Sequence, residues 1–581
     1  MSCIFNQLSH LMVQVQEPEG FRRNVLLVGL IDAFALVFFT TLAYFYYRWW
    51  SNHPLYGKNK GPKVYPLVGS VIPFLRNKHR RLEHTYETLS KTPGHTSRVV
   101  RPGRGVAFMT ANPTNVEHIL KTNFENYPKG EYWNENLREL LGNGIFNADD
   151  YLWKIQRKVA SHEFTTRSLR DFVLDSAVRE TSDRLLPFLH QASQSGLVFD
   201  LQDILARFAF DNICQLAFGV DPACLDISLP RVRFAEAFDQ ATLLSMRRLQ
   251  AFPRFMWTVK AALKIGEPQG LKRAVAVIDE FAMGVIKNRR EELAAASVRG
   301  DHKTLGGRTD LLSRFMALMG NEEEGEGEGE IVAELSRNDR KSADKLKSRG
   351  KYSSSDVFLR DIVISFVLAG RDTTTSALTW FFWVLSSHPE VELAIVDEVS
   401  RVVKARSPPN AESGGHERKK NSSTLSYEEL KNMHYLHAAL MESMRLYPPV
   451  PGDMKVARKA DVWPDGTVVP ANALTIYHPY TMGRLEELWG KDALEFKPER
   501  WLKEGMVVPQ SPYKYTVFQA GPRVCLGKDM VLLQMKLVCA AIIPNFEICI
   551  PQDYKPQYET ALTMRLRNGL PVRVRNRMTP V

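Results

Sequence analysis

The residues best suited to chemistry lie in one short segment, which reads Phe-Gln-Ala-Gly-Pro-Arg-Val-Cys-Leu-Gly from Phe518 to Gly527. Gly521 and Pro522 predict a tight turn, and the final glycine lets the backbone approach a flat ligand closely. Cys525 lies just before a helical run, where unpaired amides and the positive helix end favour a thiolate. The segment therefore predicts a thiolate ligand site. The alternative is a buried cysteine at a loop-to-helix junction, which is the commoner role of a single cysteine.

A second chemical signal, Ala-Gly-Arg-Asp-Thr-Thr, runs from Ala369 to Thr374 inside a helix-compatible stretch. Threonine hydroxyls bond to preceding carbonyl groups and bend helices, so we expect a local distortion there. A carboxylate and a hydroxyl at Asp372 and Thr373 could relay protons to a reacting oxygen. A buried Ser/Thr-rich helix with one surface aspartate and no chemistry is the alternative.

Two further groups of residues could position a bound group. Trp153 and Arg157 lie one helical turn apart, and an indole donor with a guanidinium suits a carboxylate. Glu442 and Arg445 are i,i+3 neighbours on one helix face, and a further arginine, Arg500, follows in Lys-Pro-Glu-Arg-Trp. Each motif alone has a simpler explanation, which is coincidence for the first pair and an exposed ion pair for the second.

Taken together, the four motifs resemble those of the cytochrome P-450 superfamily, the haem-thiolate monooxygenases. The resemblance implies haem b as the cofactor, with Cys525 as the ligand of the haem iron. It also implies that the haem propionates pair with the residues Trp153, Arg157 and Arg523. Phe518 would pack beside the thiolate, and Gly521 and Gly527 would shape the loop that binds the cofactor.

For the opposite face of the haem, the resemblance implies a distal helix that kinks at the second motif. The glycine there would leave room for oxygen, and Asp372 and Thr373 would deliver protons. Glu442, Arg445 and Arg500 would form a buried structural triad. Phe366 and Ala369 are predicted to line the substrate pocket, and Lys129 is predicted to anchor a substrate carboxylate.

The elements that must position these residues are mostly helical. Amphipathic patterns predict helices at Leu82–Leu89, Asn115–Lys121, Tyr151–Phe164, Leu169–Ala192, Ile204–Phe218, Leu271–Ala295, Ser355–Ser387, Glu390–Val403, Tyr427–Tyr447 and Lys528–Ile543. Strand-like runs occur at Arg98–Met109 and Thr467–Thr475. We therefore predict a mainly α protein with small β-sheets and the cytochrome P-450 fold, in one large globular domain at 72–581 with an N-terminal transmembrane helix.

The first seventy residues predict a membrane anchor. A segment at 25–47 is apolar except for Asp32 and ends in aromatic residues, which suits a bilayer span. Residues 1–24 would lie on the non-cytosolic side, and 48–71 would form a proline-rich linker. Basic residues after the span favour a body in the cytosol, and we expect the endoplasmic reticulum membrane with its lipid as a partner.

Composition sets the remaining limits. The 581 residues include 44% hydrophobic and 24% charged residues, which is ordinary for a globular protein. Six cysteines without CxxC pairs argue against a disulfide framework. The net charge is +11, but the sequence lacks the compact block of basic residues that nucleic-acid binding needs. Charged stretches at 320–351 and 404–423 are predicted to be loop insertions.

Several stretches resemble the plant fatty-acid omega-hydroxylases, a branch that also includes oxidases of jasmonoyl amino-acid conjugates: Thr110–Gly130, Gly144–Phe164, Leu368–Glu392 and Tyr477–Gly490. We therefore expect hydroxylation of a fatty acid at or near its terminal carbon, with dioxygen as co-substrate. No nucleotide-binding glycine motif occurs in a suitable context, so electrons would come from a separate NADPH-dependent flavoprotein reductase. A jasmonoyl conjugate or a sterol side chain is the alternative substrate. A haem-thiolate isomerase or dehydrase that needs no reductase is the more distant alternative.

Overall fold

The computed structural model describes residues 32–47, 61–62, 64–65, 69–101, 105–164, 167–226, 228, 232–251, 254–298, 310–320, 354–405 and 425–577. Contacts divide the chain into two units. The first unit is Met1–Lys78 with Arg98–Gly105, and the second is His79–Ser97 with Val106–Val581. The predicted domain boundary at residue 72 stays a prediction. The second unit holds every residue to which we assign chemistry.

The first unit contains a helix at residues 32–47 and the short helix α3 (Val71–Arg76). Within the described part of the chain, no helix has both the length and the apolar character needed to cross a membrane. The predicted span at 25–47 begins outside the described residues, so it stays a prediction. The predicted segment 1–24, most of the linker 48–71, and the insertions at 320–351 and 404–423 beyond their first residues also lie outside them.

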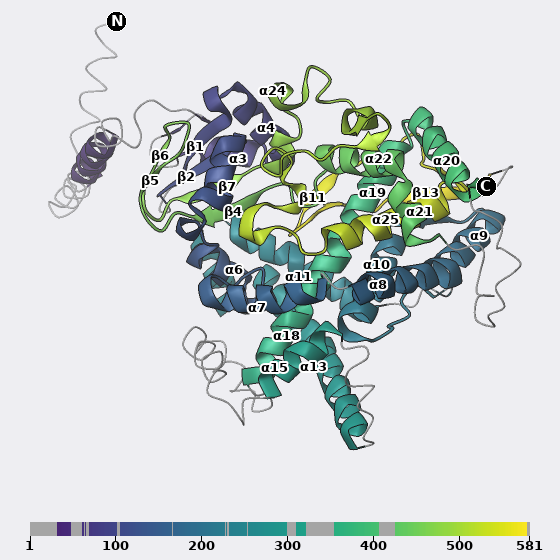
Figure 1. Ribbon diagram of the computed structural model, residues 1–581. Helices are drawn as coiled ribbons and strands as arrows, with labels where there is room; N and C mark the ends of the chain where they lie inside the picture. The colour runs from purple at the N-terminus through teal and green to yellow at the C-terminus, as the bar shows by residue number, and fades with distance from the viewer. Residues whose placement is uncertain are drawn as a thin grey trace, which may run out of the picture. The chain divides into compact units, whose positions relative to one another are not determined.

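The second unit is mainly helical, as predicted (Figure 1). Its helices are α4 (Arg81–Lys91), α5 (Pro113–Glu117), α6 (Gly130–Leu141), α7 (Asp150–Phe164), α8 (Arg167–Glu180), α9 (Leu186–Ser195), α10 (Leu201–Phe218), α11 (Arg233–Gln250), α12 (Arg254–Ala262), α13 (Gly266–Val298), α15 (Leu311–Gly320), α18 (Ser354–Val367), α19 (Thr373–Leu385), α20 (Pro389–Lys404), α21 (Tyr427–Asn432), α22 (His434–Leu446), α23 (Pro479–Met482), α24 (Glu486–Trp489) and α25 (Lys528–Ile542).

The strands are short and form small sheets. They are β1 (Thr96–Arg101), β2 (Gly105–Thr110), β3 (Val198–Asp200), β4 (Asp453–Val456), β5 (Asp461–Val462), β6 (Val468–Val469), β7 (Leu474–Tyr477), β8 (Leu502–Lys503), β9 (Met506–Val507), β10 (Phe546–Cys549), β11 (Tyr558–Thr560), β12 (Met564–Leu566) and β13 (Pro571–Asn576). Strand β7 pairs in parallel with β2 and antiparallel with β4. Strand β13 lies between β10 and β3, both antiparallel to it.

Two apolar clusters form the core of the second unit. One gathers side chains of α9, α19, α22 and α25, and the other gathers those of α6, α11, α13 and α18. Helix α10 contributes to both clusters, and it contacts α18 and α19 at the point where they meet. The junction between α18 and α19 is therefore held on a packed support, which suits a site that needs fixed geometry.

Two predicted long helices are each broken for an identifiable reason. The run Leu169–Ala192 contains a π-helical turn at Thr181–Leu185, before Pro187, which has no N–H to donate. In the run Tyr427–Tyr447, helix α21 ends before Met433 and helix α22 begins after it. The Glu398 carboxylate accepts the amides of Tyr435 and Leu436, in the first turn of α22, at 2.7 and 2.8 Å. These breaks depend on side chains distant in sequence or on hydrogen-bond geometry, which helical periodicity does not encode.

Candidate haem-thiolate site

Cys525 lies where the sequence predicted, three residues before the first residue of α25, Lys528. Its amide donates to the Phe518 carbonyl at 2.8 Å, which closes the turn of the motif. Gly521 has φ +63°, and a Cβ there would lie 1.9 Å from the Leu120 carbonyl oxygen. A side chain at this position would therefore displace the loop from its neighbour. Gly527 is the N-cap residue of α25.

The surroundings of Cys525 act on its thiol in opposite directions. The side chain is exposed in the protein chain alone. Burial within the surrounding turn nevertheless raises the pKa of the thiol, while the Gly527 amide and the charges of Arg157 and Lys528 favour the thiolate. A cation bound in front of the sulfur would lower the pKa of the thiol and so favour the thiolate, as metal coordination does.

The structure brings Arg523, Trp153 and Arg157 to the same side of this loop. The guanidinium of Arg523 lies 4.5 Å from the centre of the buried Trp153 ring. Arg157 follows one turn later on α7, close enough to Cys525 for their charges to interact. Burial lowers the pKa of Arg157, and no carboxylate is among the groups that act on it.

Arg523 has one acidic partner, which the sequence analysis did not identify. Its Nη2 donates to Asp149 at 2.8 Å and to the Ala148 carbonyl at 3.0 Å. Asp149 also accepts the amides of Lys129 and Gly130 at 2.9 and 3.0 Å. An aspartate just before an amphipathic run is typical of a helix start, and this was the available signal.

These residues fit a cofactor that carries carboxylates. The Nε atom of Arg523 is buried without a hydrogen-bond partner among the described residues. Arg157 and Arg523 together carry two positive charges, of which Asp149 balances one. A buried donor and an unbalanced cation beside a thiolate loop are the complements of an anionic, iron-containing ligand.

The distal motif forms a π-helical turn at Leu368–Asp372, between α18 and α19. This confirms the predicted distortion. The hydroxyl of Thr373 donates to the Ala369 carbonyl at 2.7 Å, and that of Thr375 donates to the Arg371 carbonyl at the same distance. Because these bonds follow the i to i−4 pattern, they are the expected source of a helix bend.

Gly370 packs against α10, and the room for oxygen that the resemblance implies there stays a prediction. A Cβ at Gly370 would lie 2.5 Å from the side chain of Ile213 on α10. The space beside this glycine is thus filled by Ile213, so Gly370 permits close packing of α10. Ala369 and Thr373 are half-buried, whereas Phe366 is buried in a core cluster.

The Asp372 side chain is only 8% exposed and is paired with Arg371, whose Nη1 lies 2.7 Å from the Asp372 Oδ1. Burial raises the pKa of Asp372 to about 6, against the opposing effect of Arg371. A carboxyl group with such a pKa can hold and release a proton near neutral pH. The sequence motif contained Arg371, but its ion pairs could not be predicted because their other partner lies on α11.

Lys129 does not present a free cation to a substrate. Its Nζ forms an ion pair with the buried Asp453 at 2.5 Å, and Lys455 pairs with the same carboxylate at 3.0 Å. Burial alone would raise the pKa of Asp453, but the two ammonium groups hold it well below its usual value. The Lys129 ammonium is therefore held in an ion pair by a residue far away in the sequence, and its role as an anchor for a substrate carboxylate stays a prediction.

Glu442, Arg445 and Arg500 lie together, fully buried or nearly so. The Glu442 carboxylate accepts hydrogen bonds from Arg445 at 2.7 and 2.8 Å and from Arg500 at 2.8 Å. It also accepts the Trp501 indole N–H at 2.9 Å. Arg445 further donates to the carbonyl groups of Ala493 and Glu495. The group ties α22 to the chain around Arg500.

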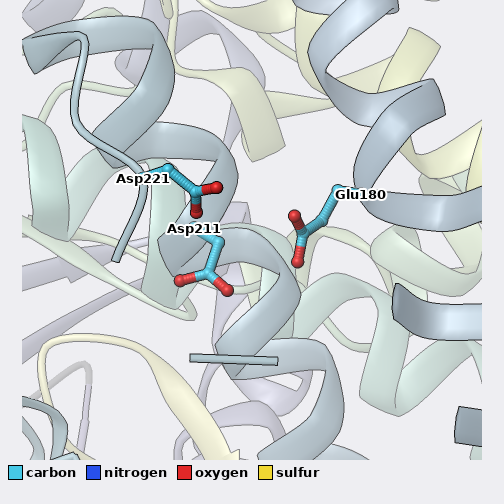
Figure 2. A group of neighbouring side chains, drawn as sticks. All are labelled: Glu180, Asp211 and Asp221. Carbon is cyan, nitrogen blue, oxygen red and sulfur yellow. The ribbon is translucent and has the colours of Figure 1, made fainter. Parts of the chain in front are cut away.

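A separate acidic group involves Glu180, Asp211 and Asp221, whose carboxyl oxygens lie within 4.8 Å of one another (Figure 2). Arg184 already lies among them, 2.8 Å from Glu180 and 2.7 Å from Asp221. The guanidinium occupies the position that a cation would need. We therefore interpret this group as an ion-pair cluster rather than a metal site.

Comparison with known proteins agrees with this geometry. The family model described as Cytochrome P450 matches residues 60–572. The chain belongs to the cytochrome P450 family. It is 43% identical to Cytochrome P450 94A2 of Vicia sativa over 89% of this chain and 91% of that protein. It is 44% identical to Cytochrome P450 94C1 of Arabidopsis thaliana, covering 81% of this chain and 84% of the relative.

A solved cytochrome P450 has the same fold. The haem domain of cytochrome P450DA aligns with a TM-score of 0.65 at 18% identity, covering 89% of this chain and 97% of that one. The cytochrome P450 fold predicted from the sequence is confirmed. Membership of the family also makes the chain a monooxygenase-type enzyme with a haem-thiolate cofactor, for which Cys525 is the ligand that the loop geometry offers.

Proposed function

We propose that this cytochrome P450 hydroxylates a fatty acid at or near its terminal carbon, with electrons from an NADPH-dependent flavoprotein reductase. The observation that carries the haem chemistry is Cys525 at the start of α25, beside the cations Arg157 and Arg523. The fatty-acid assignment is supported by the resemblance of Leu368–Glu392 and its companion stretches to the plant omega-hydroxylases.

On one face of the cofactor the residues of this chain would bind it, and on the other face they would deliver protons. Bound haem would supply the activation of dioxygen and the insertion of one oxygen atom into a C–H bond. Cys525 would hold the iron, and Arg157, Arg523 and Trp153 would hold the propionates. On the distal side, the Thr373 hydroxyl, fixed by its bond to Ala369, would pass protons that the Asp372 carboxyl supplies.

Selectivity for a chain end must come from orientation. A terminal methyl group is less reactive than an internal methylene, so the pocket must present only the chain end to the reactive centre. Ala369 of the π-helical turn and Thr373, the first residue of α19, are half-buried and are the proposed lining residues there. Phe366 is proposed to support them from the buried side of α18.

The haem assignment is tested by the carbon-monoxide spectrum of the reduced protein. We expect the red-shifted Soret band of a thiolate-ligated haem, and its loss in Cys525→Ser. Cys549→Ser, which changes a partly buried cysteine on β10, is the matched control and should keep the band. A band that survives Cys525→Ser would overturn the assignment.

The substrate assignment is tested with the purified protein, reductase and NADPH on a panel of fatty acids of different chain lengths, a jasmonoyl amino-acid conjugate and a sterol. Terminal or near-terminal hydroxy acids are the expected products. Recovery of every fatty acid unchanged would reject the assignment, and oxidation of the conjugate or the sterol would replace it. Turnover of a peroxide substrate without NADPH would instead indicate an isomerase or dehydrase.

We propose that the enzyme is anchored in the endoplasmic reticulum membrane through 25–47, with the second unit in the cytosol. Apolar side chains at residues 32–47 are exposed, including Phe34 and Phe39. Helix α12 in the second unit also exposes Phe255 and Val259 near the basic Lys260. Full-length protein should resist carbonate extraction from microsomes, and release by carbonate would contradict the anchor.

A further inference from the structure

The buried arginine of the distal turn is shared by two aspartates. Arg371 Nη1 lies 2.7 Å from Asp372 Oδ1 and also 2.7 Å from Asp239 Oδ1 on α11. The guanidinium is 5.8 Å from the ring of Phe238, the residue before Asp239. One nitrogen therefore joins the proposed proton donor to an acid on a different helix.

The two aspartates differ in their access to water. The Asp372 side chain is 8% exposed, whereas that of Asp239 is 42% exposed. Asp239 also lies 3.5 Å from Arg565 on β12, which pairs with Glu559 at 3.0 Å. Asp239 is thus the member of the trio that faces solvent, and Arg371 lies between it and the buried acid.

The other groups around these three residues do not change how Asp372 and Asp239 share Arg371. Helix α10 contributes the apolar Ile213 beside Gly370 and the thiol of Cys214, whose pKa burial raises well above its usual value. The charged groups that act on Asp372 are Arg371, which favours its ionised form, Asp239, which disfavours it, and the more distant Arg565. A bond from Arg371 to Asp239 therefore weakens the hold of Arg371 on Asp372.

We propose that Asp239 is a positioning residue that keeps Asp372 protonatable by competing for Arg371. The role of Asp372 in this inference rests on the proposed function. Without Asp239, the guanidinium would serve Asp372 alone and hold it as a carboxylate, which can accept a proton but has none to donate. With Asp239 in place, the buried acid can take up a proton from the solvent side and release it toward Thr373.

The first test measures unfolding free energy against pH in the haem-loaded, full-length protein. Asp372 protonates at a higher pH when folded than when unfolded, so its contribution to stability is greatest below pH 4 and falls as the pH rises to about 6. Asp239→Asn should shift the end of this fall to lower pH. In an Asp372→Asn background, the same substitution should produce no such shift.

The comparison is a double-mutant cycle, so the titration of Asp239 itself cancels. Asp239→Glu keeps the carboxylate and should restore the profile of the unsubstituted protein. Glu267→Gln removes an exposed acid that pairs with Arg247 at 3.0 Å, and it should change nothing. An equal effect of Asp239→Asn with and without Asp372 would overturn the proposal.

The second test measures the share of NADPH electrons recovered as product rather than as peroxide. Asp239→Asn should lower product formation at neutral pH by about tenfold for each pH unit by which the pKa of Asp372 falls. Unchanged coupling, despite a shifted stability profile, would overturn the link to proton delivery. If the unsubstituted protein oxidises no fatty acid, the proposed substrate fails while the stability cycle still decides the role of Asp239.

Discussion

Two buried ion-pair clusters in this enzyme have opposite charge ratios. The Glu442 cluster sets one carboxylate against Arg445 and Arg500, and every oxygen of that carboxylate accepts hydrogen bonds. The Glu180 cluster sets Glu180, Asp211 and Asp221 against Arg184. In the second cluster, the Oε1 atom of Glu180 is buried without a hydrogen-bond partner among the described residues.

The pKa of Glu180 follows from that ratio. Burial and the neighbouring charge of Asp211 raise it to about 8, against the opposing effect of Arg184. Glu180 is therefore largely protonated at neutral pH, so the cluster lowers its excess charge by holding a proton. In the Glu442 cluster, by contrast, two guanidinium groups face one carboxylate. Burial and an excess of neighbouring acids thus act together to raise the pKa of Glu180.

The largest expected effect is on the Glu442 cluster. Glu442→Gln would leave the buried Arg445 without an ion-pair partner among the described residues and Arg500 paired with Asp492 alone, at 3.2 Å. Unfolding free energy should therefore fall by roughly 3–5 kcal/mol. Denaturant unfolding measures the change. Glu495→Gln is the control, because only its backbone carbonyl contacts Arg445 and its side chain is exposed. Equal stability of the two variants would mean that the cluster contributes nothing.

A smaller loss is expected when the single cation of the Glu180 cluster is removed. Arg184→Gln should cost about 1–3 kcal/mol, because Arg184 is partly exposed and Asp221 can be hydrated. The loss should grow as the pH rises, since more of the acids are then ionised. A loss that stayed constant between pH 5 and 9, as measured by urea unfolding, would contradict the charge argument.

Glu180→Gln should change stability in the opposite direction. The folded-state pKa of Glu180 is raised above its unfolded value, so this group destabilises the protein progressively between about pH 4.5 and pH 8. Glu180→Gln removes this titration, so the unfolding free energy should fall less steeply over that pH range, by at most roughly 1.4 kcal/mol for each pH unit. Asp183→Asn, on an exposed position of the same turn, should leave the profile unchanged. An unaltered slope in Glu180→Gln would show that Glu180 is ionised throughout.

The smallest effect sharpens the account of the Glu442 cluster. Trp501→Phe removes the indole donor to Glu442 but keeps an aromatic ring, and both arginines remain. We expect a loss of about 1–2 kcal/mol in unfolding free energy. A loss as large as that of Glu442→Gln would transfer the main role from charge pairing to the packing of the Trp501 ring.

The clusters also show where sequence reasoning succeeds. The family resemblance alone placed Arg500 in the Glu442 cluster. Local motifs with fixed spacing predicted Cys525 before a helix, the distortion near Thr373 and the pair of Glu442 with Arg445. Each involves a helix face, a helix end or a short turn, which chain geometry determines within a few residues. The fold followed from the same motifs, because their order along the chain matched a known superfamily.

Long-range partners could not be predicted in the same way. Asp149 binds Arg523 across 374 residues, and Asp453 neutralises Lys129 across 324. The packing of Ile213 against Gly370 likewise joins different helices. These contacts depend on tertiary packing, so a single sequence offers only weak signals such as the helix-start position of Asp149.

The contact between Asp149 and Arg523 has a consequence for how the enzyme matures. Before any cofactor arrives, the newly folded chain must keep Arg523 and Arg157 beside one another. Asp149 supplies a counter-charge and fixes the guanidinium over Trp153. Asp149 thus holds Arg523 as a propionate would, so bound haem would complete a charge network that the chain itself has half formed.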